Sequence, residues 1–290
     1  MQPRYCYSLA TVYSLATVFF HCLFTVVFIS LLTPPSIVHI IPFLHCWLEP
    51  VSKHFTVRST PVVFGNGTFL GSFSAQTTLN SEGLKPLFQQ LDIDDPESVR
   101  AARDFFKEKY GGLDVLINNA GIAFKRTYWN PSCDSFKTNF FATRDMCNEF
   151  LPIIKPGGRV VNVSSVMSSI ALNRCSPELQ ARFRSNDITE EELEGLMKRF
   201  VQEAQAGAHS QGGLTVLSRI HARKLRHERP ADQILLNACC LGWVRTDMAG
   251  PNGPKSPDEG AITPVSLALL PAGAGEPHGQ FVIDKKVHPW

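Results

Sequence analysis

The sequence predicts an α/β fold built on a doubly wound parallel sheet with helices on both of its faces. Strand-like and helical segments alternate from about residue 85 to the C terminus. The strand-like runs are short and almost entirely apolar, which is typical of strands that helices bury on both faces. Turn and helix-capping residues separate these segments. We therefore expect a folded domain over residues 85–290, an irregular linker over 61–84 and a separate apolar segment over 1–60.

Capping residues and spacing define the first elements of the domain. A strand-like run covers residues 87–91, and Asp94-Asp95-Pro96 place an acidic cap and a proline at the start of a helix. Apolar residues then recur at helical spacing until Gly111-Gly112 ends the helix; they are Val99, Ala102, Phe106 and Tyr110. The next strand is predicted over 114–118, and a helix over 140–151.

The C-terminal half continues the alternation. A turn at Lys155-Pro156-Gly157-Gly158 precedes a strand predicted over 159–163. Thr189 and Glu192 have the spacing of a capping box for a helix with one apolar face. Further segments predict a helix over 214–225 and strands over 234–239 and 280–283. The complete series contains five parallel strands.

Charge and cysteine content exclude several classes of protein. The chain has 28 basic and 26 acidic side chains, a formal net charge of +2, which argues against binding of nucleic acid through phosphate contacts. Its eight cysteines include no C-x-x-C pair, and Cys239 and Cys240 are adjacent. This pattern fits neither a zinc site nor a small disulfide scaffold, so we expect no metal and mostly buried, reduced thiols on the cytosolic side.

The N-terminal segment differs from the rest of the chain. Residues 1–50 contain two charged side chains, Arg4 and Glu49, and residues 8–32 contain none. An uncharged apolar stretch of this length predicts a transmembrane helix, since about 20 residues cross a bilayer. The stretch is too long for a signal peptide, and too few basic residues flank it to predict its orientation. Because YSLATV occurs twice in succession, an alternative or wrongly assigned first exon is an equally good interpretation.

Five short motifs follow one another along the domain. They are Leu91-Asp92-Ile93-Asp94, Asn118-Asn119-Ala120-Gly121, Lys137-Thr138-Asn139, Val161-Asn162-Val163-Ser164-Ser165 and Gly242-Trp243-Val244-Arg245-Thr246. The series closely resembles the short-chain dehydrogenase/reductases, and among them the NADPH-dependent carbonyl reductases, over about 200 residues. The resemblance implies a Rossmann-like sheet, and a reaction in which NADPH reduces ketones, aldehydes and quinones to alcohols.

The resemblance also implies roles for individual residues. Asp92 and Ile93 would flank the adenine of the cofactor. Asn119, Ala120 and Gly121 would line the adenosine ribose, where a small turn lets the backbone approach a dinucleotide. Val244, Arg245 and Thr246 would contact the nicotinamide amide and the pyrophosphate. Ser165 would hydrogen-bond the substrate carbonyl, and Asn139 would position a water of the proton relay. From the residues alone, each position has a second interpretation: Asp92 as a strand-end cap, Ser164 and Ser165 as turn residues, and Asn118–Gly121 as a tight turn.

The catalytic pair of the family is absent. Its general acid is a tyrosine four residues before a lysine, so that the ammonium lowers the pKa of the phenol. The five tyrosines are residues 5, 7, 13, 110 and 128, and none follows Ser165. Lys198 and Lys224 have no tyrosine partner and are expected on solvated helix faces. Tyr128 is the first candidate for a substitute acid.

The front of the family's cofactor site is also missing. The family begins with a strand and a glycine-rich turn whose amides hold the pyrophosphate, and its strands lie in the order 3-2-1-4-5-6-7. Here Val62–Gly71 only imitates that turn, because 26 residues between Gly65 and Asp92 are too few for the elements that should intervene. We therefore expect an incomplete sheet, with the first two strands and the glycine-rich turn replaced and an apolar edge exposed.

Three functional hypotheses follow. The first is a carbonyl-reductase-like oxidoreductase, inactive or impaired, with NADPH as cofactor and a small carbonyl compound as substrate. The second is a binding protein without catalysis that keeps a carbonyl or partner site around Asn139 and Ser165. The third is an isoform with no stable fold. The family resemblance implies a cytoplasmic monomer, and residues 8–32 would instead anchor the chain to a membrane. The histidines His209, His221 and His227 show no catalytic spacing and are expected in ordinary helix or surface positions.

Overall fold

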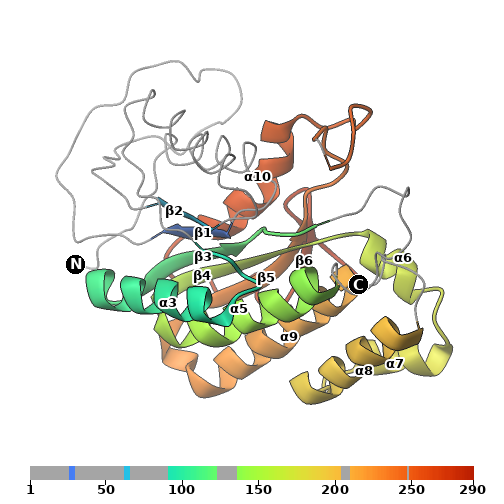
Figure 1. Ribbon diagram of the computed structural model, residues 1–290, viewed down its shortest axis with the longest axis horizontal. Helices are drawn as coiled ribbons and strands as arrows, with labels where there is room; N and C mark the ends of the chain where they lie inside the picture. The colour runs from blue at the N-terminus through green and yellow to red at the C-terminus, as the bar shows by residue number, and fades with distance from the viewer. Residues whose placement is uncertain (1–25, 30–61, 66–90, 123–135, 204–209, 247) are drawn as a thin grey trace.

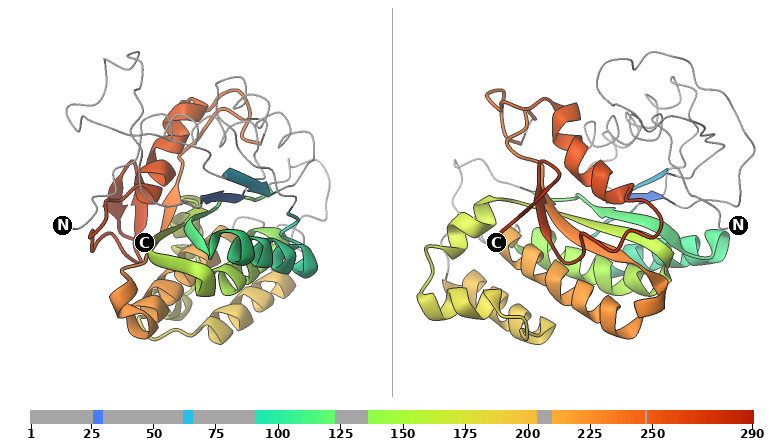
Figure 2. Two further views of the ribbon diagram at one scale, coloured as in Figure 1. Left: turned by 90° about the vertical axis from the view of Figure 1, so that its left-hand side faces the viewer. Right: turned by 180° about the vertical axis from the view of Figure 1, so that it is seen from behind.

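The computed structural model describes residues 26–29, 62–65, 91–122, 136–203, 210–246 and 248–290. These residues form three layers (Figures 1 and 2). A central sheet carries the helices α3 (Pro96–Tyr110), α5 (Thr143–Phe150) and α9 (Ser210–Glu228) on one face. Helix α10 (Pro257–Ala268) lies on the opposite face. The prediction of helices on both faces of the sheet is therefore confirmed.

The sheet has the strand order β2-β1-β3-β4-β5-β6-β7. Its strands are β1 (Val26–Ile29), β2 (Val62–Gly65), β3 (Leu113–Asn118), β4 (Ile154–Ser164), β5 (Leu235–Cys240), β6 (Phe281–Ile283) and β7 (Lys286–His288). The strands β3, β4, β5 and β6 are parallel to their neighbours in this series, whereas β7 pairs antiparallel with β6. Four of the five predicted parallel strands are thus confirmed. The fifth, over 87–91, lies outside the described residues except for Leu91, which belongs to no strand.

Two further strands extend the sheet beyond β3, at the edge that was predicted to be exposed. Strand β1 pairs antiparallel with β3, so that Val26 lies opposite Asn118, and β2 pairs antiparallel with β1. The structure differs here from the transmembrane helix predicted over 8–32, because Val26–Ile29 form a strand. These four residues are β-branched or aromatic, types that favour strands, and the free edge of β3 offers them hydrogen-bond partners. The other residues of 8–32 lie outside the described ranges, within which no helix has the length and apolarity to cross a bilayer.

Helix α3 forms as its capping residues predict. The Asp95 side chain accepts a hydrogen bond from the Glu97 backbone N–H, and Gly111 ends the helix with a left-handed φ of 70°. The four apolar residues expected at helical spacing, from Val99 to Tyr110, are its buried residues. They pack against α5 and the sheet in one continuous core.

The other predicted elements agree in type with the structure and differ at their ends, and further elements were not predicted. The expected helix over 140–151 is a π-helix, η1 (Lys137–Ala142), continued by α5 and the 3-10 turn η2 (Leu151–Ile153). The predicted turn at 155–158 is an irregularity within β4, where Gly157 has a φ of 77°. Helices α6 (Met167–Leu172) and α7 (Pro177–Arg184), the 3-10 turn η3 (Pro230–Asp232), α10 and β7 were not predicted.

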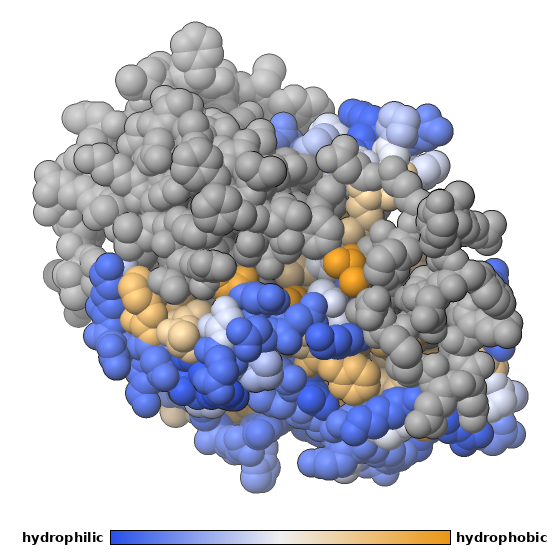
Figure 3. Space-filling view, viewed as in Figure 1, coloured by the Kyte–Doolittle hydropathy of each residue, from blue (hydrophilic) through white to orange (hydrophobic). Residues whose placement is uncertain are grey.

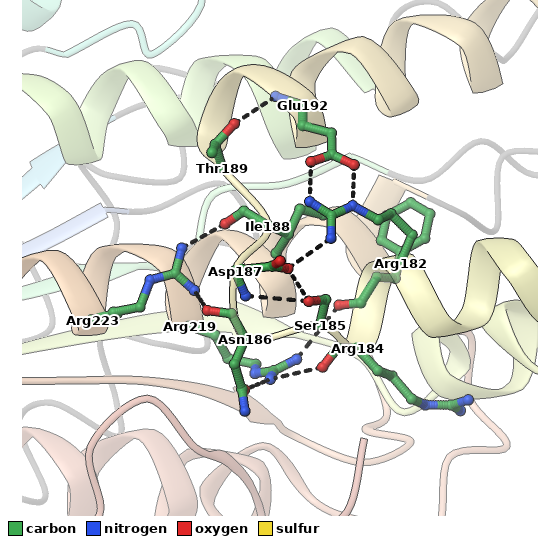
Figure 4. Close-up of polar contacts among 11 residues, drawn as sticks. Arg182, Arg184, Ser185, Asn186, Asp187, Ile188, Thr189, Glu192, Arg219 and Arg223 are labelled. Carbon is green, nitrogen blue, oxygen red and sulfur yellow. Dashed lines mark hydrogen bonds and ion pairs between the residues drawn. The ribbon is translucent and has the colours of Figure 1, made fainter.

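Helix α8 (Glu190–Glu203) begins with half of the expected capping box. The Glu192 N–H donates to Thr189 Oγ1 over 3.2 Å, but the Glu192 carboxylate pairs with Arg182 of α7. Arg219 of α9 donates to the Arg184 carbonyl at the end of α7, and Arg223 of α9 donates to the carbonyls of Asn186 and Ile188 in the loop between α7 and α8 (Figure 4). These arginines fix the pair of helices to α9. The outer surface of the helix layer is mostly hydrophilic (Figure 3), as expected for a solvated face.

Candidate active site

The ends of three parallel strands bring the predicted site residues to one edge of the sheet. Asn118 ends β3, Ser164 ends β4 and Cys240 ends β5. The register pairs Asn118 with Asn162 and Ser164 with Cys240, so these ends lie at nearly the same level. The segments 119–121, 165 and 244–246 therefore all emerge at the carboxyl edge, where open α/β sheets bind their ligands.

Asn139 braces the segment that follows β3. It lies in the π-helix η1, and such helices are frequent at functional sites. Its amide oxygen accepts from the Ile122 N–H over 2.7 Å, and its amide nitrogen donates to the Ile122 carbonyl over 2.8 Å. A Cβ at Gly121 would lie 3.2 Å from the Asn139 oxygen, so the glycine permits this close approach. The Asn139 side chain thus holds the turn of Asn119, Ala120 and Gly121 in place.

The two serines at the end of β4 have different environments. Ser164 is buried, and its hydroxyl lies 2.8 Å from Thr215 Oγ1 of α9. Ser165 is half-buried; its hydroxyl oxygen accepts from the Met167 N–H over 3.2 Å. That bond uses a lone pair and leaves the Ser165 hydroxyl hydrogen for a donated bond, as the predicted contact with a carbonyl oxygen requires.

A buried polar network continues from Ser164 along the interface between α9 and the sheet. Asn162 donates to Ser218 Oγ over 2.9 Å and accepts from the Asn118 side chain over 2.8 Å. Cys147 of α5 adjoins the same Asn162 oxygen, and burial raises the pKa of its thiol to about 12. Asn162 itself is fully buried. This network joins the strand ends to α9, which contains the segment 214–219 where the family resemblance would place the catalytic pair.

The structure locates the residues considered as substitutes for that pair. Of the five tyrosines, Tyr110 alone falls within the described ranges, and it is packed in the core at the end of α3. Tyr128 lies outside the described residues. Lys198 pairs with Glu194 one turn away on α8, and Lys224 is exposed on α9. The two lysines thus occupy solvated helix faces, as expected.

The residues expected near adenine lie in the turn that leads into α3. Asp92 is exposed, and its carboxylate accepts from the Asp94 N–H over 2.9 Å. Ile93 is buried in the core, so a ligand at this position would meet its backbone. Asp94 accepts from Thr138 Oγ1 over 2.7 Å, which ties this turn to η1 beside Asn139. The first and third motifs are therefore in direct contact.

The segment after β5 is held by the loop that follows it. Val244 is buried and forms a bridge with Lys255. The Arg245 guanidinium donates to the carbonyls of Gly253 and Pro254 over 2.9 and 3.0 Å, and Thr246 Oγ1 accepts from the Ala249 N–H over 3.2 Å. Lys255 also donates to the Leu241 carbonyl over 3.2 Å and pairs with Asp284. Lys255 thus connects the loops after β5 and β6.

Several residues that form the site or hold its residues in place were not predicted from the sequence. Thr215, Ser218 and Lys255 carried no motif, although Thr215 and Ser218 lie three residues apart on a helix expected to pack on the sheet. His221 lies in helix α9, as one of the two expected positions, and it is buried there with its Nε2 3.0 Å from a carboxylate oxygen of Glu190. Within the described ranges, no group of three or more His, Cys, Asp or Glu side chains could hold a metal ion.

The described strands reproduce only part of a dinucleotide site. Beside β3, the family places a parallel strand whose carboxyl end leads into the phosphate-binding turn. Here β1 takes that place in the antiparallel direction, so the chain leaves β1 at the opposite edge of the sheet. Gly65 of β2 does lie at the level of Val26 and Asn118, but one strand further out. The described residues therefore include the candidate segments after β3, β4 and β5 but no glycine-rich, phosphate-binding turn beside β3.

An open, mostly parallel sheet with polar motifs at its carboxyl edge defines a dinucleotide-binding α/β protein of the Rossmann type. The family model of the short chain dehydrogenases matches residues 72–177. "Carbonyl reductase [NADPH] 1" of Rattus norvegicus is 61% identical over 228 residues, which cover 73% of this chain and 82% of the rat protein. The Homo sapiens protein of that name is 60% identical over 233 residues, 75% of this chain and 84% of its own length.

Two solved structures share the fold. Salutaridine reductase from Papaver somniferum has a TM-score of 0.64 at 24% identity and covers 76% of this chain and 90% of its own. NADPH-bound carbonyl reductase from chicken fatty liver has a TM-score of 0.55 at 22% identity, over 79% and 88% of the two chains. On the sequence relatives above, this chain belongs to the short-chain dehydrogenase/reductase family. Within it, the chain is a carbonyl-reductase-like oxidoreductase.

Proposed function

We propose that this chain is a carbonyl-reductase-like protein that keeps the carbonyl-binding part of the site but reduces its ligand very slowly or not at all. The family reaction is reduction of ketones, aldehydes and quinones by NADPH. The proposed carbonyl ligand lies at the carboxyl edge of β4, where the Ser165 hydroxyl donates to its oxygen. Asn139 supports the neighbouring turn by its two hydrogen bonds with Ile122.

The observation that carries the proposal is the pair of residues that α9 presents to the sheet. The helix contacts the end of β4 through Thr215 and the middle of β4 through Ser218. Both are aliphatic alcohols, which are far weaker acids than a phenol, and Ser164 and Asn162 already engage them. No tyrosine follows Ser165 in the chain. The described helix therefore offers no general acid for the alkoxide that hydride transfer forms.

The size of the expected loss of reaction rate follows from two missing features, the general acid and the turn that holds the cofactor phosphates. A positioned general acid contributes about 10²–10⁴ in rate. Holding the two reactants in the correct geometry contributes at least as much again. NADPH would supply the hydride when bound, and the described strands offer no phosphate cradle to hold it. Since both losses act on the same step, Ser165 alone cannot restore the family rate.

A measurement of NADPH oxidation tests the proposal. The full chain is mixed with NADPH and 1,4-naphthoquinone, and absorbance is followed for the wild type, Ser165→Ala and Tyr128→Phe. We expect all three rates to agree within error. A wild-type rate that Ser165→Ala abolishes would refute the proposed inactivity, and its loss in Tyr128→Phe would identify the substitute acid.

The second candidate function, carbonyl binding without turnover, is favoured by the intact supports of Ser164, Ser165 and Asn139. Calorimetric titration of the wild type with 1,4-naphthoquinone in the absence of NADPH tests it. We expect binding that Ser165→Ala weakens by about 3- to 10-fold, the value of one hydrogen bond. Equal affinity in the two proteins would exclude Ser165 as the ligand contact. A protein that melts without a cooperative transition would instead support an isoform with no stable fold.

A further inference from the structure

The C-terminal residue of the chain reaches the site through one intermediate side chain. The Trp290 indole nitrogen donates to Ser168 Oγ over 2.8 Å, across 122 positions of sequence. Ser168 is buried in the first turn of α6, the helix that begins two residues after Ser165. Its hydroxyl donates to the Ser165 backbone carbonyl over 2.6 Å, and its N–H donates to the same carbonyl over 3.0 Å.

The direction of this chain of hydrogen bonds is fixed by chemistry. An indole N–H can only donate, so the Ser168 oxygen accepts from Trp290. The Ser168 hydroxyl hydrogen is then directed to the Ser165 carbonyl. Hydrogen bonds in such a series polarise and strengthen one another in a buried setting. The first turn of α6 also holds the Ser165 hydroxyl, through the Met167 N–H. The backbone carbonyl and the side-chain hydroxyl of Ser165 therefore both depend on the placement of this turn.

Trp290 is itself held from two sides. Its ring packs against the core formed by η1, α8 and α9 and against the smaller cluster around β5 and β6. Arg184 of α7 donates to its carbonyl over 3.4 Å and binds Gln180 and Asn173 through its other nitrogens. The indole is therefore a fixed donor rather than a loose terminal side chain.

We propose that Trp290 is a positioning residue for the carbonyl site, acting through Ser168 on the Ser165 peptide. This inference rests on the proposed function, because Ser165 is the ligand contact of that site. Loss of the indole donor leaves the first turn of α6 less firmly held. The Ser165 hydroxyl then meets a carbonyl ligand in a less well-defined position, and the affinity falls.

The first test needs no ligand. Hydrogen exchange of the amides of residues 166–170 is compared in the wild type, Trp290→Phe, Ser168→Ala and Val287→Ala. Phenylalanine keeps an aromatic ring and removes the donor, and Val287 is an exposed control residue close to the C terminus. We expect faster exchange in Trp290→Phe and Ser168→Ala, by about 3- to 10-fold, and wild-type exchange in Val287→Ala. Unchanged exchange in Trp290→Phe would overturn the inference.

The second test asks whether the effect acts through Ser165. Affinity for 1,4-naphthoquinone is measured for Trp290→Phe, Ser165→Ala and the double variant, which forms a double-mutant cycle. We expect Trp290→Phe to weaken binding in the wild-type background and to add nothing in the Ser165→Ala background. Equal weakening in both backgrounds would show a general structural role and overturn the inference. A wild type that binds no quinone would refute the carbonyl site, and the exchange experiment would still decide whether Trp290 positions Ser165.

Discussion

The hydroxyl of Thr215 in helix α9 lies 2.8 Å from the hydroxyl of Ser164 at the last residue of strand β4, and both side chains are buried. This bond joins the helix to the strand end from which Ser165 emerges. Because the bond is internal to the protein, it supports the site without supplying an acid to it.

Replacement of Thr215 by valine keeps the shape of the side chain and removes the bond. The buried Ser164 hydroxyl then loses this partner, which costs about 1–3 kcal/mol of unfolding free energy. Urea unfolding followed by far-UV circular dichroism measures the change. Thr215→Ser, which keeps a hydroxyl, is the matched control and should lose less. A valine variant as stable as the wild type would show that the bond contributes nothing.

Arg159 supports the opposite end of β4. It is 2% exposed, and it donates to the backbone carbonyls of Gly157, Gly158, Gln233, Leu270 and Pro271. Its replacement by methionine fills similar space and removes the donor from these five carbonyls, of which that of Gly158 belongs to a buried residue. We expect a loss of about 1–3 kcal/mol in urea unfolding. Arg100→Met, on the solvated face of α3, serves as the control and should change stability by less than about 0.5 kcal/mol.

His278 makes the folded state sensitive to mild acid. Burial is the main cause that lowers the pKa of His278 from its usual 6.5, and the charge of Arg226 also lowers it, whereas the hydrogen bond to the Ala222 carbonyl and the charge of Glu276 act in the opposite direction. Its Nε2 donates to the Ala222 carbonyl over 2.8 Å and its Nδ1 accepts from the Leu236 N–H over 3.3 Å, so both nitrogens suit the neutral ring. Below pH 6.5 the unfolded chain binds this proton more readily than the folded chain does.

Stability should therefore fall as the pH decreases from about 7 to 5.5. Replacement by glutamine, which is also a donor and an acceptor, should reduce this dependence and lower stability at pH 8. Urea unfolding of both proteins at pH 8, 6.5 and 5.5 gives the slope of the unfolding free energy against pH for each. Equal slopes for wild type and His278→Gln would contradict the assignment.

Glu190 makes the stability of the folded state depend on pH in a second, more acidic range. Its burial opposes ionisation, but hydrogen bonds from His221 and Asn148 and the charge of Arg144 outweigh it and lower the pKa to about 2. The folded state thus gains stability above pH 4.5 and loses it as the pH falls from about 4.5 toward 2. The stability difference between wild type and Glu190→Gln should shrink between pH 5 and pH 3, and a constant difference would refute this account.

The sequence was most informative where local pattern and tertiary burial coincide. The apolar runs of β3 and β5 and the capped helix α3 were predictable, because their interior faces follow directly from residue spacing. Strand β1 was not, since Val26–Ile29 lie in a long uncharged stretch whose local pattern favours a membrane helix. Their strand conformation depends on pairing with β3, nearly 90 residues further along the chain.

The candidate site divides in the same way. The motifs single out Ser165, Asn139 and the segments after β3 and β5 as candidates, because they carry their residue types in a fixed order, and the roles of these residues remain predictions. The partners that hold them were not predictable from motifs. Thr215, Ser168 and Trp290 act through contacts between distant segments, and a serine or a terminal tryptophan has no sequence signature for such a role.

The direction of β1 limits how a working cofactor site could be engineered into this protein. A phosphate-binding loop grafted after Ile29 would emerge on the wrong side of the molecule. A graft after Gly65 would emerge on the correct side, because β2 runs parallel to β3, but it would be displaced sideways by one strand spacing, about 4.8 Å. A redesign therefore has to place a strand parallel to β3 in the position that β1 now occupies.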